Sequence, residues 1–289
     1  MLLALSEQFP WLYLTLVTLL GLLVGSFLNV VIHRLPIMLE RSWQQEFHSY
    51  FHPEQAAPPS SAPYNLVLPR SACPHCGHQI RAWENIPLIS WLCLRGRCSQ
   101  CQAAISPRYP LVELVSGIMT LVIALQLPAG LQQWSAILLG WVLLALTCID
   151  LDKMLLPDQL TLPLLWLGLL LNSQSLFVAL PDAVFGAAAG YLVLWSLYWG
   201  FKLLTGKEGM GYGDFKLLAA LGAWLGWQAL PLILILASCV GAVVGIGLLL
   251  LRRHQQGNPI PFGPYLATAG WIALLWGEQI NHWYLSTLL

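Results

Sequence analysis

The feature that most constrains the fold is a set of long stretches without any charged residue. They run from Trp11 to Ile32, from Trp134 to Ile149, from Ala183 to Phe201 and from Leu217 to Leu251. About 20 apolar residues are enough to cross a bilayer as a helix. Only 9% of the residues are charged, against about 25% in an ordinary soluble domain. The pattern predicts an all-α polytopic membrane protein and excludes a soluble enzyme, a secreted disulfide scaffold and a disordered chain.

The charge-free segments predict about eight transmembrane helices. We place them at residues 11–31, 109–127, 133–150, 159–178, 183–202, 214–228, 231–251 and 262–283. The uncharged block 217–251 is too long for one crossing, and Gly226 and Pro231 mark a turn within it. A polar segment follows the first helix. We therefore expect a first transmembrane helix at 1–32, a cytosolic segment at 33–108 and a seven-helix membrane domain at 109–289.

Lys and Arg residues indicate the orientation of such a chain, because cytoplasmic loops are enriched in them. Seven of the 13 lie in the segment 33–108, and the others are Lys153, Lys202, Lys207, Lys216, Arg252 and Arg253. With eight alternating helices all 13 fall on one side, whereas the opposite loops 127–133 and 172–182 carry none. We expect the basic side in the cytosol and both termini in the periplasm. The net charge of +0 gives no bulk attraction to nucleic acid, so membrane lipid is an expected partner and nucleic acid is not.

Four of the seven cysteines form two pairs, CPHC and CSQC, in the polar segment. They are Cys73, Cys76, Cys98 and Cys101, with 21 residues between the pairs. Two such pairs can place four thiolates around one tetrahedral zinc ion, so we predict a structural zinc site in the segment 33–108. A disulfide is disfavoured in the reducing cytosol, and a redox pair would need a thioredoxin-like context that is absent. His75 and His78 flank the first pair and remain alternative ligands.

Two aspartates are expected on the same side of the membrane and at similar depth. Asp150 ends the third predicted helix, and Asp214 begins the sixth in the sequence GMGYGDFKLL. Ionisable groups at membrane depth are costly and usually functional. Two carboxylates in a poorly hydrated site share one proton, which is the arrangement of aspartic proteases. Gly211 and Gly213, with Gly209, leave the backbone before Asp214 free to accept an extended peptide closely.

Structural roles compete with catalysis for several of the acidic residues. Asp214 can also be a helix N-cap, and Asp158 has the position of a helix-start residue. Asp152 is expected to be solvated, and Glu113 can pair with Arg108 at the membrane interface. The sequence contains no HExxH, GxSxG or GxxxxGK[ST] element, so zinc metalloprotease, serine hydrolase and nucleotide-hydrolysing functions have no motif.

The order of several sequence blocks resembles that of the bacterial type IV prepilin peptidases. Besides the two cysteine pairs, these blocks are GSFLNVVIHRLP (25–36), NIPLISWLCLRGRC (85–98), ISPRYPLVELVSG (105–117), IDLDKMLLPD (149–158) and GMGYGDFKLLAALGAWLG (209–226). The GxGD element alone is a weak signal. The blocks together, in this order and at these predicted depths, are specific, and they cover almost the whole chain.

The resemblance implies a GxGD-type intramembrane aspartyl protease in which Asp150 and Asp214 are catalytic and Gly211 and Gly213 belong to a substrate-positioning loop. It implies prepilin and pseudopilin substrates of type IV pilus and type II secretion systems. These carry a short basic leader, which is cut after a Gly on the cytosolic side of the bacterial inner membrane. It further implies N-methylation of the new first residue, usually Phe, with S-adenosylmethionine as donor.

The residues that bind the methyl donor cannot be assigned to a motif. No Rossmann-like GxGxxG is present, which leaves the zinc segment and the neighbouring blocks 25–36 and 108–113 as candidates. An ion- or proton-coupled transporter using the same aspartates is an alternative function, and so is a scaffold that recruits partners through the zinc segment. The transporter predicts no cleaved product, and the scaffold predicts dispensable aspartates.

Overall fold

The computed structural model describes residues 2–51, 63–250 and 260–288. Arg252 and Arg253, two of the basic residues used above for the orientation, lie outside these ranges. Within them every regular element is a helix, and the loops add only two isolated β-bridges, which confirms the all-helical prediction. The chain forms two compact units, unit 1 (Met1–Gly130) and unit 2 (Leu131–Leu289), which we describe separately.

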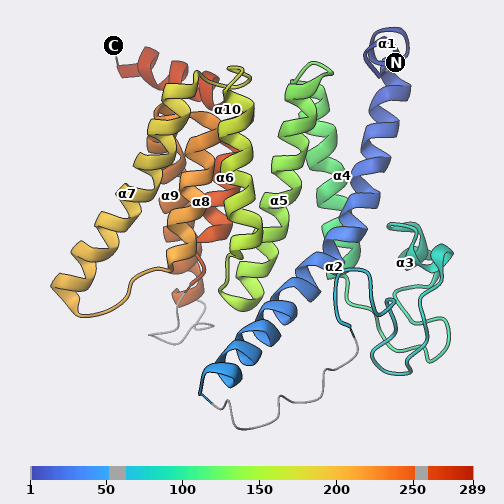
Figure 1. Cartoon of the computed structure of the whole chain (residues 1–289). Helices are drawn as coiled ribbons and strands as arrows, with labels where there is room; N and C mark the ends of the chain where they lie inside the picture. Colours follow the sequence, from blue (N-terminus) through green and yellow to red (C-terminus); the bar gives the residue numbers. More distant parts are fainter. Residues whose placement is uncertain (1, 52–62, 251–259, 289) are drawn as a thin grey trace. The chain divides into compact units, whose positions relative to one another are not determined.

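The helices of the two units are coloured along the sequence in Figure 1. Unit 1 contains α1 (Leu2–Gln8), α2 (Pro10–Phe51), the 3₁₀ helix η1 (Ala82–Asn85), α3 (Ile89–Cys93) and α4 (Arg108–Gln126). Unit 2 contains α5 (Leu131–Lys153), α6 (Asp158–Asn172), α7 (Leu180–Thr205), α8 (Tyr212–Leu225), η2 (Trp227–Ala229), α9 (Leu230–Leu250) and α10 (Gly263–Leu288). The division after Gly130 comes one helix later than the expected boundary at 109, because α4 packs on α2.

Five segments of the described residues are long and apolar enough to cross a membrane. They are Pro10–Phe51, Arg108–Gln126, Leu131–Lys153, Leu180–Thr205 and Trp227–Leu248. The expected number of eight is not confirmed. α6 and α8 have 15 and 14 residues, fewer than the roughly 20 of a typical crossing. α10 has 26 residues but carries Glu278, Gln279 and His282 in its second half.

α2 is much longer than the first transmembrane helix predicted from the sequence. It has 42 residues and continues through residue 32, where the apolar stretch ends. The following residues include Leu, Met, Glu, Arg and Gln, which are all good helix formers. Pro36 lies inside the helix, and a proline there removes a backbone hydrogen bond and favours a bend. Figure 1 shows α2 changing direction along its length.

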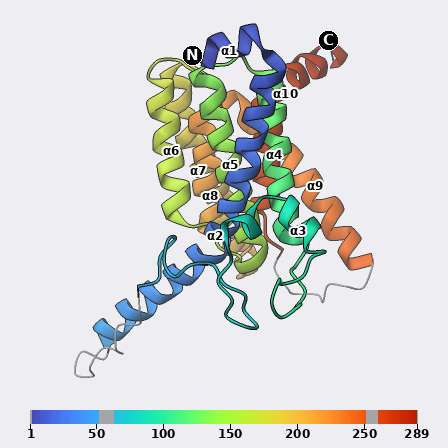
Figure 2. The same cartoon turned by 90° about the vertical axis from the view of Figure 1, so that its right-hand side faces the viewer.

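α2 and α4 lie side by side, as both views show (Figure 2). Glycines on α2 allow the close approach. A Cβ atom on Gly21 would lie 2.6 Å from Thr120 Oγ1, and one on Gly25 would lie 2.7 Å from Glu113 Cα. The Ser116 hydroxyl donates to the Gly21 carbonyl at 2.7 Å. Small residues four apart and a hydroxyl bonded across the contact are typical of helix pairs in membranes.

α8 is the central helix of unit 2 and contacts α6, α7, α9 and α10. Ten of its 14 residues are buried, and Phe215, Leu218 and Trp224 belong to the hydrophobic core. Gly186 of α7 and Gly222 of α8 touch backbone to backbone, because a Cβ atom on either would overlap the carbonyl of the other. The first turn of α8, which carries Asp214, is buried with the rest of the helix.

A fully buried asparagine ties the end of α6 to the end of α8. The Asn172 amide donates to the carbonyls of Ala223 and Trp224 at 2.8 and 3.1 Å. Its oxygen accepts the N–H groups of Phe177 and Val178 at 2.9 and 3.1 Å. Both donors and both lone pairs of the amide are therefore used. The side chain closes the α6–α7 turn onto α8.

Candidate functional sites: a four-cysteine cluster and an aspartate pair

The four predicted zinc ligands form one cluster in unit 1. Their sulfur atoms all lie within 4.8 Å of one another. The Sγ–Sγ distance is 3.7 Å between Cys73 and Cys101 and 4.0 Å between Cys76 and Cys98. A tetrahedral zinc with Zn–S bonds of about 2.3 Å places its sulfurs about 3.8 Å apart. The donor set and its spacing therefore fit one zinc ion.

The two cysteine pairs adopt the same backbone turn. In the first turn, the Cys73 N–H donates to the His78 carbonyl and the Gly77 N–H to the Cys73 carbonyl, both at 2.9 Å. In the second turn, the Cys98 N–H donates to the Ala103 carbonyl at 2.9 Å and the Gln102 N–H to the Cys98 carbonyl at 3.1 Å. The residue after the second cysteine has a positive φ in both turns, 73° at Gly77 and 59° at Gln102. Backbone hydrogen bonds from Cys76 and His75 lower the pKa of Cys73 to about 7. This direction favours the thiolate form of Cys73, the form in which a cysteine binds a metal ion.

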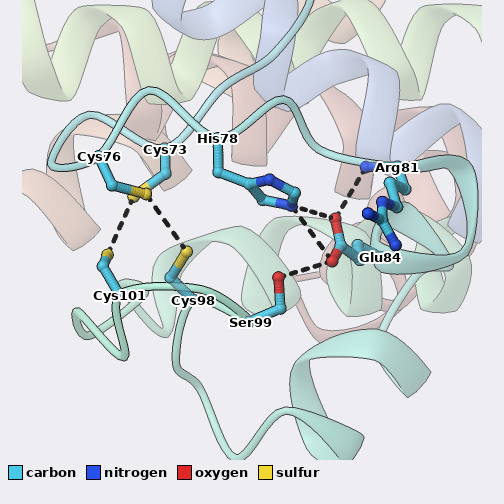
Figure 3. A network of polar contacts seen from close by, with 8 residues as sticks. All are labelled: Cys73, Cys76, His78, Arg81, Glu84, Cys98, Ser99 and Cys101. Atoms are coloured by element: carbon cyan, nitrogen blue, oxygen red, sulfur yellow. Dashed lines mark hydrogen bonds and ion pairs between the residues drawn. The ribbon is translucent and has the colours of Figure 1, made fainter.

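Glu84 connects the two cysteine turns, as Figure 3 shows. Its carboxylate accepts the Arg81 N–H at 2.8 Å and the Ser99 hydroxyl at 2.7 Å, and it lies 3.1 Å from His78 Nε2. His78 follows the first pair, and Ser99 lies within the second. The bond from the Arg81 N–H, helped by Ser99 and His78, lowers the pKa of Glu84 to about 2.

The two histidines beside the first pair are not part of the sulfur cluster. The His78 ring is occupied with Glu84, and His75 is exposed. Among the residues that the structure describes, the only group of His, Cys, Asp and Glu side chains close enough to hold a metal consists of the four cysteines. The geometry therefore favours a site with four cysteine ligands over one with a histidine.

Unit 2 brings Asp150 and Asp214 together. Asp150 lies in the last turn of α5 and Asp214 in the first turn of α8, and their exposed fractions are 5% and 6%. They are close enough for the charge of Asp150 to act on Asp214. Asp150 Oδ2 accepts the N–H of Gly263 at 3.0 Å. Asp214 Oδ1 is buried and has no hydrogen-bond partner among the described residues, so this oxygen is available to a ligand.

Gly263 and Leu156 complete the surroundings of the aspartates. Gly263 begins α10, and a Cβ atom there would lie 2.6 Å from Asp150 Oδ2. Leu156 is 7% exposed and fills the space between Gly263 and Gly213. A Cβ atom on Gly213 would lie 2.8 Å from the Leu156 Cβ. Glycine at both positions leaves room for Leu156 and the Asp150 carboxylate.

The other residues singled out near the aspartates have simpler roles. Gly211 is the N-cap of α8, so Asp214 is not. A Cβ atom on Gly211 would come no closer than 3.9 Å to the Asp214 carboxylate. Asp158 is the first residue of α6 and binds Lys216 Nζ at 2.6 and 2.8 Å, while Asp152 is exposed.

Glu113 does not have the hydrogen-bond partner, Arg108, that its sequence position suggested. It is 8% exposed and lies in α4. Its carboxylate accepts the N–H of Leu88 at 2.9 Å. It does not pair with Arg108, because the loop before α3 lies against it instead.

The sequence matches known families over most of its length. Residues 19–127 match the bacterial peptidase A24 N-terminal domain, and residues 137–246 match the type IV leader peptidase family. The chain belongs to the type IV leader peptidase family. The interval between the two matches contains Gly130, after which the structure divides into its two units.

Curated relatives are similar to the chain from end to end. The prepilin leader peptidase/N-methyltransferase of Aeromonas salmonicida strain A449 is 68% identical over 289 residues, which are 100% of this chain and 99% of the relative. The protein of the same name from Aeromonas hydrophila is also 68% identical over 289 residues. The one from Pseudomonas aeruginosa is 59% identical over 277 residues, 96% of this chain and 95% of the relative. No solved structure matches the chain significantly. The resemblance drawn from the sequence blocks is confirmed.

The roles of two residues in these sites, Gly263 and Glu84, were not predicted from the sequence. Gly263 stands in PFGP, directly before an apolar run, and a proline next to the start of such a run is a helix-start signal. That signal identifies the start of α10 but not its contact with Asp150. Glu84 stands three residues after Arg81, the spacing of a capping box, yet its bonds to both cysteine turns depend on the folded segment.

Proposed function

We propose that this chain is an aspartic leader peptidase that removes the leader of prepilins and pseudopilins and then methylates the new N-terminus. One observation carries the peptidase half. Two carboxylates from different helices, Asp150 and Asp214, are buried near enough to interact electrostatically, and Asp214 Oδ1 has no partner within the described residues. The names of the relatives support both halves.

The proposed chemistry follows from two carboxylates that share one proton. The ionised aspartate takes a proton from a water molecule, and the water oxygen attacks the scissile carbonyl. The protonated aspartate donates a hydrogen bond to the carbonyl oxygen and then protonates the leaving amine. Burial of both groups strengthens these interactions, because little water competes.

The surroundings suggest how the peptide is held. Gly209, Gly211 and Gly213 precede Asp214 without side chains, so an extended leader can lie against this backbone. Leu156 forms an apolar wall at the same place. We propose that the Gly at the cleavage site passes between this wall and the aspartates, while the hydrophobic helix of the substrate remains in lipid.

For the methyltransferase half, the proposed donor is S-adenosylmethionine, and its site would lie in the zinc segment or in the neighbouring blocks 25–36 and 108–113. The four cysteines would hold a zinc ion that is fully ligated by protein and therefore structural. Zinc supplies the folding free energy that a short segment with few large apolar residues lacks. Glu84, with its bonds to both cysteine turns, would keep the two halves of the site in register.

We further propose that the chain resides in the bacterial inner membrane with the aspartates facing the cytosol. Eight crossings with both termini in the periplasm remain the arrangement that best fits the distribution of Lys and Arg. A prepilin whose leader lies in the cytosol would then present its scissile bond at the depth of the aspartate pair.

One experiment tests this function and separates it from the alternatives. Detergent-solubilised protein is incubated with a prepilin and S-adenosylmethionine, and the product is analysed by mass spectrometry. We expect loss of the leader and then the mass of one methyl group. A transporter or a scaffold would leave the prepilin uncut.

A further inference from the structure

Glu113 in unit 1 is a buried carboxyl group that forms no ion pair with a described residue. Among the described residues, the Leu88 N–H donates a hydrogen bond to it, and this donor is neutral. No Lys, Arg or His in the described part of the chain forms an ion pair with it. An ionised carboxylate in poorly hydrated surroundings is unfavourable unless a cation is present. The missing cation is the first indication of a ligand.

The backbone that binds Glu113 is held in a rare conformation. Leu88 has φ 61° and ψ −48°, and the Ile89 N–H donates to the Pro87 carbonyl at 2.6 Å. These are the features of a γ-turn with positive φ, which is rare and strained. Strained backbone is concentrated at functional sites. Here the turn directs the Leu88 N–H at the Glu113 carboxylate.

Neutral polar side chains of α2 bind the loop before α3 and the first turn of α4, close to Glu113 along the chain. Ser26 lies 3.5 Å from Asn85 Oδ1, and Asn29 donates to the Tyr109 carbonyl at 3.1 Å. Gly25 contacts the backbone of Glu113 directly, so at this position α2 has no side chain over it. The residues come from three separate sequence blocks, 25–36, 85–98 and 105–117. The result is one buried carboxyl group in a neighbourhood of hydroxyl and amide side chains.

We propose that the Glu113 carboxylate binds the positively charged onium group of the methyl transfer, either the sulfonium of the donor or the α-ammonium of the mature peptide. The inference rests on the proposed methyltransferase function and names a residue for it. In the reaction the amine first releases a proton to water. Its nitrogen lone pair then forms the N–CH₃ bond while the S–CH₃ bond breaks and its electron pair stays on sulfur. One positive charge thus moves from sulfur to nitrogen, and a carboxylate beside the path is complementary to it throughout.

The test is Glu113→Gln, which removes the charge and keeps an oxygen that accepts the Leu88 N–H. We expect methylation of a synthetic peptide that begins with the mature Phe to fall at least 100-fold in kcat/KM, with leader cleavage unchanged. Glu46→Gln, which changes an exposed carboxylate of α2, is the matched control and should methylate normally. A purely structural Glu113 would tolerate Gln, so wild-type methylation by Glu113→Gln overturns the proposal.

Binding measurements show which onium group is recognised. Calorimetry compares S-adenosylmethionine with S-adenosylhomocysteine, which lacks the charge, and the free peptide amine with its N-acetylated form. Glu113→Gln should lose the preference for the charged member of one pair. If methylation is lost while both preferences stay unchanged, Glu113 is structural and the proposal fails.

A measurement on the unaltered protein covers the case in which the variant does not fold. Ultraviolet cross-linking of radiolabelled S-adenosylmethionine should label residues 25–36, 85–98 or 105–117, and labelling confined to other segments contradicts the site. If the wild-type protein itself does not methylate the peptide, the proposed function fails rather than this inference.

Discussion

Glu84 in unit 1 and Asp214 in unit 2 are both buried carboxylates, and they differ in what surrounds their oxygens. The Glu84 side chain is 5% exposed and is bonded to Arg81, Ser99 and His78. Asp214 is 6% exposed, and its Oδ1 has no partner in the described residues. An unsatisfied buried polar atom costs about 1–3 kcal/mol. The saturated Glu84 carboxylate thus links parts of its segment, whereas the free Asp214 oxygen leaves room for a bond to a substrate, as the proposed function requires.

The largest expected effect tests the unsaturated carboxylate. Asp214→Asn should reduce leader cleavage by on the order of 10³-fold or more, because the pair can no longer share a proton. Asp152→Asn, which changes an exposed neighbour of Asp150, is the control and should retain most activity. Cleavage is followed by the shift of a prepilin band. Normal cleavage by Asp214→Asn would rule out the aspartyl mechanism.

Removal of two cysteine sulfurs tests whether unit 1 holds a structural zinc ion. The double change Cys73→Ser and Cys76→Ser should lower the zinc content from about one ion per chain to none, because two ligands cannot hold a structural zinc. The measurement is elemental analysis of purified protein. Cys239→Ser on α9 should leave the zinc content unchanged. A wild-type protein that is folded, active and free of zinc would refute the site.

Gly263→Ala tests whether Asp150 needs its present orientation. The new Cβ would stand 2.6 Å from Asp150 Oδ2, so the carboxylate must move. A displacement of about 1 Å in a catalytic group costs about 10²-fold, and we expect this loss in kcat of cleavage with little change in KM. Gly277→Ala on the same helix meets nothing closer than 3.9 Å and should cleave normally. Equal rates for the two variants would show that the Gly263 contact is irrelevant.

Glu84→Gln tests the saturated carboxylate and its pH dependence. The folded-state pKa of Glu84 is about 2, below the ordinary 4.5, so its charge stabilises the folded segment above about pH 4.5. This contribution is lost as the pH falls through 4.5 towards 2. We expect Glu84→Gln to bind zinc about tenfold more weakly at pH 7 and the difference from wild type to shrink in acid. The thiols titrate in both proteins, so a difference that grows in acid would contradict this role.

The smallest expected effect separates the two activities. Asp214→Asn should methylate a peptide that already begins with the mature Phe at the wild-type rate, because methyl transfer needs no aspartate pair. Damage to the cysteine cluster should reduce methylation at least as much as cleavage. Radiolabelled donor measures both. Loss of methylation in a correctly folded Asp214→Asn protein would mean that the two reactions share one site.

Sequence patterns predicted those features that depend on residue type and spacing. The CxxC pairs indicated the cysteine cluster, and apolar runs indicated helices. The end of α2 was not predictable, because hydropathy falls after Ile32 whereas helix propensity does not. The sequence also did not indicate that α4 packs on α2. This packing depends on the fit of Gly21 and Gly25 against a helix some 90 residues later.

Positions that act through backbone groups were also invisible in the sequence. The Gly263 N–H meets Asp150 across 113 residues, and no residue type encodes such a contact. Asn172 looks like an ordinary turn residue at the end of an apolar helix, yet all of its hydrogen-bonding groups are used. Long-range complementarity, rather than local propensity, determines both.

The contact between Gly186 and Gly222 has a consequence for genetics. A substitution that introduces a larger residue into a packed core can often be compensated by a smaller residue at the position it contacts. No residue is smaller than glycine, so neither Gly186 nor Gly222 can be replaced in this way. A substitution at either position therefore has no suppressor at the other. Revertants of Gly186→Ala or Gly222→Ala should arise by true reversion or by changes that shift α7 as a whole. This pair is expected to be among the least evolvable contacts of the chain.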